Sequence, residues 1–181
     1  ISLKDVFQIL FRKEGEQTAY NIVWEIRLPR ILAAVILGGA LSVSGFLLQT
    51  FFGNPIAGPF VLGISSGAKL VVALTMIYLL GKSMVATSGV MIIAAFIGSL
   101  ISMGFVLLIS RKVKQMSMLV VSGIMIGYIC SAVTDFAVTF ADDSNIVNLH
   151  NWSLGSFSGT SWDNVSVMAV VVFAALFITF L

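Results

Sequence analysis

The feature that most constrains this chain is a long uncharged stretch, from Ile31 to Phe52, which directly follows the charged segment EIRLPR. A helix that crosses the hydrocarbon core of a bilayer needs about 20 apolar residues. Four further stretches reach or approach this length, and the predicted spans are residues 31–52, 61–80, 84–109, 116–140 and 165–181. The second span is expected to be broken near its start, at GISSGAK. The pattern predicts an all-α integral membrane protein.

Composition supports this class and excludes others. Only 10% of the 181 residues are charged, against about 25% in soluble domains. The net charge of +2 is small and scattered, so nucleic-acid binding is not expected. Cys130 is the only cysteine, which excludes an internal disulfide and a cysteine-based metal site. Because the sequence begins with Ile1 and stops inside an apolar stretch, we expect a fragment of a longer protein.

Small residues recur every four positions within several predicted spans. In lipid, helices associate through close backbone approach at such residues. We therefore expect a compact multi-helix bundle, with contacts at three triads: Ala34, Gly38 and Ser42; Ala94, Gly98 and Ser102; and Gly123, Gly127 and Ser131.

Charge alone leaves the orientation in the membrane open. Cytoplasmic loops are enriched in lysine and arginine. The side of the N-terminal segment carries six such residues mixed with acids, whereas the opposite side carries four, three of them in RKVK at 111–114. A count of six basic residues against four places the N-terminal segment in the cytoplasm. The RKVK loop contains no acidic residue, and this favours the opposite orientation, with that loop in the cytoplasm.

A series of motifs in fixed order resembles the FecCD-type permeases, the membrane subunits of bacterial ABC importers for iron–siderophore, haem and cobalamin. The matching residues are RLPR at 27–30, GGAL and SG in the stretch that follows, Gln49, Asn54-Pro55-x-Ala57-x-Pro59, LGISSGA at 62–68, MLVVSGIMIGYICSA at 118–132 and WSLGSFSGTSW at 152–162. The resemblance covers nearly the whole chain.

The resemblance implies ten helices per subunit in a dimer, either a homodimer or a pair with a close homologue. On that pattern this chain is a single transmembrane domain fragment that starts after the first helix and stops within the sixth. Residues 1–30 are then extracytoplasmic and RKVK at 111–114 is cytoplasmic, which overrules the plain charge count. The implied partners are membrane lipid, cytoplasmic ATPase subunits and an extracytoplasmic substrate-binding protein, and no cofactor is expected.

Arg27 and Arg30 match the family's arginines that receive carboxylates of the binding protein. A guanidinium stays charged and grips a carboxylate in a bidentate fork. Pro29 at the first helical turn fixes φ and needs no amide donor, so it holds both side chains near the surface. The alternative is that the pair only anchors a helix end by snorkelling.

The loop between the first two predicted spans can be interpreted as a structural element or as part of the substrate path. Its prolines and glycines break helicity, which membrane proteins tolerate only where protein or a water-filled cavity covers the freed backbone groups. The residues concerned are Gln49, Asn54, Pro55, Pro59, Gly63 and Gly67. A tight turn packed on neighbouring helices and a segment beside the substrate path both fit.

Two short matches in this loop resemble hydrolase motifs. Residues 63–67 fit GxSxG and residues 66–69 fit SxxK, but a nucleophile elbow needs a strand–turn–helix setting and partner residues. An intramembrane serine hydrolase using Ser65 is therefore a minor alternative. A secondary transporter is another alternative, but we would expect it to carry more intramembrane charge than Asp135.

Three residues are weaker candidates for the translocation path or its gate. Asp135 is the one acid inside a predicted span, and it either faces the path or lies near enough to the interface to be solvated. Met116 and Ser117 match the turn where the family closes its cytoplasmic gate. Asp142, Asp143 and His150 are too scattered to predict a metal site.

The sequence thus predicts a non-enzymatic permease subunit of an ATP-driven importer for iron–siderophore, haem or cobalamin-like chelates, in a bacterial inner membrane.

Overall fold

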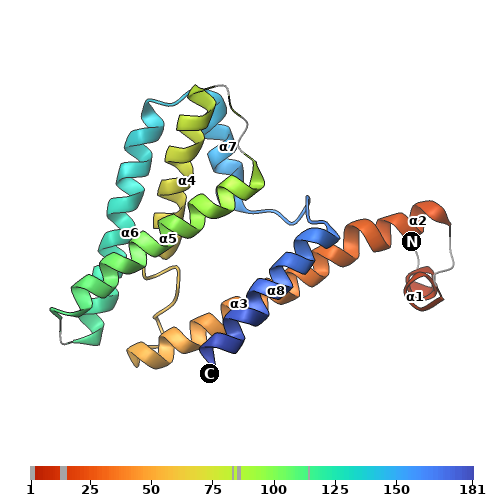
Figure 1. The fold of residues 1–181 in the computed structure, drawn as a ribbon, viewed down its shortest axis with the longest axis horizontal. Helices are drawn as coiled ribbons and strands as arrows, with labels where there is room; N and C mark the ends of the chain where they lie inside the picture. The colour runs from red at the N-terminus through yellow and green to blue at the C-terminus, as the bar shows by residue number, and fades with distance from the viewer. Residues whose placement is uncertain (1–2, 13–15, 83, 85–86, 114) are drawn as a thin grey trace. The chain divides into compact units, whose positions relative to one another are not determined.

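The computed structural model describes residues 3–12, 16–82, 84, 87–113 and 115–181, and no strand occurs among them. Its helices, shown in Figure 1, are α1 (Leu3–Arg12), α2 (Gln17–Asn21), the π-helix η1 (Ile22–Arg27), α3 (Leu28–Phe52), α4 (Ile64–Gly81), α5 (Ser88–Ser110), α6 (Met116–Thr139), α7 (Asp143–Leu154) and α8 (Trp162–Thr179). The all-α prediction is confirmed. These helices form two compact units, Ile1–Val43 with Ser156–Leu181, and Ser44–Gly155.

Within the described residues, four helices are long and apolar enough to cross a membrane: Gln17–Phe52, Ser88–Ser110, Ser117–Thr139 and Trp162–Thr179. The first joins α2, η1 and α3 into one helix of 36 residues. The apolar part of α4, Ile64–Leu79, is shorter. The break expected at GISSGAK is wrong for residues 64–69, which are continuous helix in α4, and only Gly63, the first residue of this motif, precedes the helix. That residues 1–181 form a single transmembrane domain stays a prediction.

Small residues set the packing of α4, α5 and α6 in the second unit. A Cβ atom added to Gly67 would lie 2.7 Å from the carbonyl oxygen of Gly98, and one added to Gly123 would lie 2.8 Å from the Cα of Leu62. Such distances leave no room for a side chain, so the backbones touch at these points. Two of the three predicted small-residue triads, those on α5 and α6, therefore supply helix contacts.

A buried hydrogen bond joins α5 to the start of α4. The Ser102 hydroxyl, 1% exposed, donates to the carbonyl of Gly63 at 2.9 Å. Gly63 has φ +73°, a conformation open mainly to glycine. Its carbonyl also accepts from the amide of Gly67 at 3.0 Å, which closes the first turn of α4.

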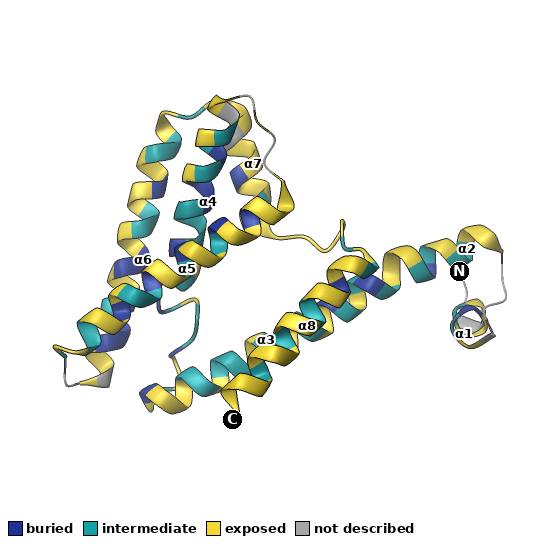
Figure 2. Ribbon diagram, viewed as in Figure 1, coloured by how far each residue is buried: buried dark blue, intermediate teal, exposed yellow. Residues whose placement is uncertain are grey.

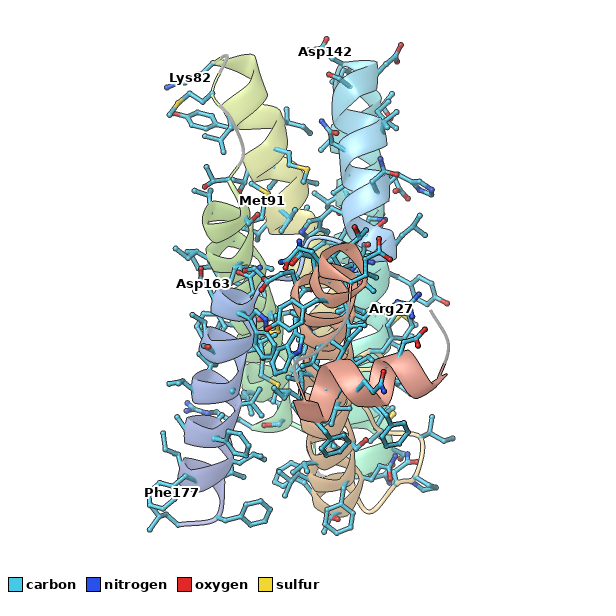
Figure 3. All side chains as sticks on the ribbon, turned by 90° about the vertical axis from the view of Figure 1, so that its right-hand side faces the viewer. Arg27, Lys82, Met91, Asp142, Asp163 and Phe177 are labelled. Carbon is cyan, nitrogen blue, oxygen red and sulfur yellow. The ribbon has the colours of Figure 1, made fainter. Side chains whose placement is uncertain are left out.

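Two apolar clusters fill the second unit around these contacts. One gathers Leu62, Val106, Leu119 and their neighbours, and the other gathers Val72, Met76, Met91 and Leu149. Leu149 belongs to α7, which runs beside α4. Figure 2 shows the buried positions of these helices on their facing sides and the exposed positions outside. Lys82 and Asp142 lie at one end of the unit in Figure 3.

The first unit places α1 against the start of the long helix. Ile9 is fully buried, and its carbonyl accepts a hydrogen bond from the indole of Trp24 at 3.4 Å. Phe7 and Phe11 lie on the exposed side with their ring centroids 5.8 Å apart. Helix α1 is therefore amphipathic.

Candidate functional site

The first candidate region is the π-helix η1 and the proline that follows it. The amide of Leu28 donates to the carbonyl of Val23, five residues back. Pro29 has no N–H, so it cannot donate to the carbonyl of Trp24, the next acceptor along this ladder. The indole Nε1 of Trp162, at the start of α8, donates to that carbonyl at 2.9 Å. The donor that proline lacks is thus replaced by a side chain from α8.

Arg30 lies one residue beyond this proline and is tied to the segment before α8. Its Nη2 atom donates to the carbonyl of Ser158 at 2.6 Å. Its Nε atom is buried and has no hydrogen-bond partner among the described residues. The Ser156 hydroxyl accepts from the amide of Ser158 at 3.1 Å, which shapes the turn that presents this carbonyl. Arg30 therefore has an internal partner.

Arg27 differs from Arg30 although only three positions separate them. It is the last residue of η1, and its side chain is exposed. The structure gives the Arg27 guanidinium no hydrogen bond or ion pair within the described residues. Figure 3 shows the labelled Arg27 at the outside of its helix. Arg27 is available to an external acceptor, and Arg30 is available only in part.

The length of the helix suits a membrane boundary at these arginines. Its 36 residues extend about 54 Å at a rise of about 1.5 Å per residue. The hydrocarbon core of a bilayer is about 30 Å thick, a distance that the uncharged residues 31–52 already cover. The segment from Gln17 to Arg30 therefore extends past the hydrocarbon core, and Arg27 and Arg30 fall at the boundary.

The second candidate region is the loop between α3 and α4, and its residues make local contacts. Asn54 Oδ1 accepts from the amide of Ile56 at 2.9 Å, and the Asn54 amide donates to the carbonyl of Gln49 at 3.1 Å. Ala57 is fully buried, whereas Pro55 and the side chain of Gln49 are exposed and Pro59 is half-buried. These bonds hold the loop in one conformation.

The glycines at the end of this loop are packing residues. A Cβ atom on Gly63 would lie 2.7 Å from the carbonyl oxygen of Gly123 and 2.8 Å from the amide nitrogen of Gly127. Gly67 is closed off in the same way by Gly98 and Ser102. The match of residues 63–67 to GxSxG therefore arises from close helix packing, and the described residues around it lack the strand that a nucleophile elbow requires.

The remaining predicted residues are not brought together. The Asp135 side chain is exposed on α6, and Ser117 is exposed in the first turn of the same helix. Met116 begins α6, but its side chain lies outside the described part of the structure. Asp142, Asp143 and His150 are exposed on or beside α7. Among the described residues, no group of three or more histidine, cysteine or acidic side chains could hold a metal ion.

Comparison with known proteins shows which family this chain resembles. The model of the FecCD transport family matches residues 1–181. The vitamin B12 import system permease protein BtuC of Klebsiella pneumoniae is 37% identical over 150 residues, covering 83% of this chain and 44% of the relative. BtuC of Serratia proteamaculans is 36% identical over 164 residues, covering 90% of this chain and 48% of the relative.

A solved structure supports the same fold. A protein reported as a metal-chelate type ABC transporter in an inward-facing conformation matches with a TM-score of 0.75 and 23% identity, covering 89% of this chain and 50% of that one. The chain belongs to the FecCD transport family. It spans about half the length of the relatives that it matches. These findings support the predictions that it is a membrane protein of a transport class and not an enzyme.

Several residues of these regions could not be found from the sequence. Ser158 and the carbonyl of Trp24 act through the backbone, which no side-chain pattern reveals. The one available signal for the second is Pro29, since a proline inside a helix leaves an acceptor that needs another donor. Lys69 stands out in the sequence only within a hydrolase-like motif, although it is the charged residue of a short apolar helix.

Proposed function

We propose that the full protein is the permease subunit of an ATP-driven importer in a bacterial inner membrane. Its cargo is a chelate of the class that includes cobalamin, iron–siderophore and haem. Membership of the FecCD family over the whole chain is the observation that carries this proposal. The named relatives are vitamin B12 import permeases, which supports cobalamin within that class.

Import by this transporter requires several further protein chains. Residues 1–181 contain no phosphate-binding motif of the GxxxxGK[ST] type, and cytoplasmic ATPase subunits are the proposed source of energy. A second permease subunit, the same or a close homologue, completes the path. An extracytoplasmic binding protein delivers the cargo, and lipid surrounds the helices.

Within this proposal, Arg27 and Arg30 form the docking site for the binding protein. Residues 1–30 then face the extracytoplasmic side and RKVK at 111–114 faces the cytoplasm. The exposure of Arg27 supports this role, because a guanidinium that no described residue engages can take a carboxylate in a bidentate fork. Arg30 contributes its remaining donors and orders the turn at Ser158.

Further positions have a proposed place on the translocation path. Asp135 is exposed on α6 and would contact water or cargo, and Met116 and Ser117 would stand at the cytoplasmic gate. The loop residues Gln49, Asn54, Pro55, Pro59, Gly63 and Gly67 support the path structurally. The hydrogen bonds of Asn54 and the close packing of both glycines favour this supporting role.

Uptake into vesicles tests the function directly. Vesicles with the full-length permease and its ATPase, supplied with binding protein, should accumulate cyanocobalamin or a ferric hydroxamate siderophore only when ATP is present on the ATPase side. The matched control carries an ATPase inactivated in its phosphate-binding loop and should show background uptake. Uptake driven by a proton or sodium gradient without ATP would indicate a secondary transporter and contradict the proposal.

A further inference from the structure

A cavity of about 550 Å³ lies in the second unit, between the start of α4, the middle of α6 and the end of α7. Its polar lining consists of Ser65, Ser66, Lys69, Ser131 and Ser153, with Trp152 beside them. We call it the serine–lysine cavity. Its volume falls within the range of about 300–1,000 Å³ that is usual for small-molecule sites.

Among the described residues of this lining, Lys69 is the one that carries a charge. It is half-buried, with Ser65 and Ser66 one turn before it and an apolar stretch after it, and it makes no hydrogen bond or ion pair within the described residues. A charged group inside a membrane-spanning bundle is costly, and such groups pair with a partner or mark a pathway. The described lining offers no acid, so the charge is left for a ligand to balance.

The position of the cavity along its helices argues against a simple anchor. Gly63, just before α4, touches Gly127, which is near the middle of α6 (Met116–Thr139). Ser131 follows one turn later on α6, and Lys69 is near the start of α4. Lysines that snorkel to the interface belong to the ends of spans, whereas Lys69 is level with the middle of α6.

We propose that the serine–lysine cavity binds one carboxylate group of a water-soluble chelate or of its organic ligand. A single ammonium balances a single carboxylate, whereas a phosphate monoester carries up to two negative charges and would leave one unbalanced. The hydroxyls of Ser65, Ser66 and Ser131 donate hydrogen bonds to the carboxylate oxygens, and the Ser153 hydroxyl, which donates to the carbonyl of His150 at 2.8 Å, accepts from a hydroxyl group on the ligand. Trp152 offers an aromatic face to an apolar part of the same molecule. This inference rests on the proposed function, since it assigns a cargo chemistry to the permease.

Ligand-observed NMR titration of the full-length permease in phosphatidylcholine nanodiscs tests the inference. The probes are 4-hydroxybenzoate and its neutral counterpart 4-hydroxybenzamide. The wild-type protein should bind the carboxylate at least roughly tenfold more tightly than the amide, and Lys69→Met should weaken carboxylate binding by a similar factor, as expected for one charge-assisted hydrogen bond. Lys69→Arg should retain binding. Lys82→Met is the matched control and should not change it, because Lys82 lies outside the cavity and bonds to Tyr78.

Equal affinity for the two probes, or an unchanged affinity in Lys69→Met, would overturn the inference. Loss of carboxylate binding when phosphatidylglycerol is added to the discs would assign the cavity to a lipid phosphate and overturn it as well. These outcomes concern binding to the permease alone. Failure of the proposed function would instead appear as absence of ATP-driven uptake by the wild-type complex.

Discussion

Arg27 and Arg30 show how two identical side chains, three positions apart, come to have different surroundings. Arg30 donates to the carbonyl of Ser158 and holds the segment that leads into α8. Arg27 ends the π-helix with an exposed side chain. Docking by the pair and anchoring of the helix end by snorkelling both stay predictions; the structure gives Arg30 an internal contact and leaves the Arg27 guanidinium exposed.

Measuring the stability of two single variants tests whether Arg30, but not Arg27, contributes to folding. Arg30→Ala should lower the unfolding free energy of the full-length permease by about 1 kcal/mol, since a partly exposed hydrogen bond from a charged group is lost. Arg27→Ala is the matched control and should stay within about 0.5 kcal/mol of wild type, as most surface substitutions do. Thermal unfolding in detergent measures both. Equal losses in the two variants would show that the bond to Ser158 contributes nothing specific.

At the scale of elements, the contacts of α4 with α5 and α6 depend on glycine. A Cβ atom on Gly98 would overlap the backbone carbonyl of Gly67 and lie 2.9 Å from the Cα of Ala68. Since the obstacles are backbone atoms, no side-chain rotation can relieve them. Gly104 lies on the same helix and has nothing within 4 Å of such an atom.

This difference predicts the outcome of a matched pair of substitutions. Gly98→Ala should destabilise the full-length permease by about 1–3 kcal/mol, the usual cost of overpacking. Gly104→Ala should be neutral or slightly stabilising, because alanine favours the helix over glycine by about 0.5–1 kcal/mol. Thermal unfolding and the yield of folded protein report the effect. A Gly98→Ala variant as stable as Gly104→Ala would refute the packing described above.

The elements themselves could be predicted, but much of the site could not. Uncharged apolar stretches predict the long helices, and the small-residue triads at Gly98 and Gly123 mark real contacts. A Cβ atom added to Gly38, in the first triad, would meet nothing within 4 Å. The bond from Arg30 to Ser158 joins positions 128 apart, and that from Trp162 to Trp24 joins positions 138 apart. Such pairs depend on tertiary placement and on backbone carbonyls, which periodicity cannot reveal.

At the scale of the whole molecule, each unit has its own part in the proposed transporter. The unit Ile1–Val43 with Ser156–Leu181 carries Arg27 and Arg30, the proposed docking residues. The unit Ser44–Gly155 holds the packed helices, the motif loop and the serine–lysine cavity. The family model covers both. Both units then belong to one proposed permease, which receives its cargo from a binding protein on the face of Arg27.

The affinity of the purified binding protein for the full-length permease tests this claim most directly. Close interfacial charge pairs couple by about 1.5–7 kcal/mol. Arg27 and Arg30 would lie at the edge of the interface and lose only part of their water on docking, so their coupling energy should fall near the low end of this range. Arg27→Glu with Arg30→Glu should therefore cost about 2 kcal/mol, roughly thirtyfold in affinity. Acid-to-arginine changes on the binding protein should restore part of it.

Lys112→Glu is the control for charge alone, because Lys112 is exposed between α5 and α6 and is assigned to the cytoplasmic face. It should leave the affinity unchanged. Arg27→Glu alone should account for most of the loss while leaving the bond of Arg30 to Ser158 intact. An affinity that is unchanged by the double reversal, or lowered as much by Lys112→Glu, would contradict the account.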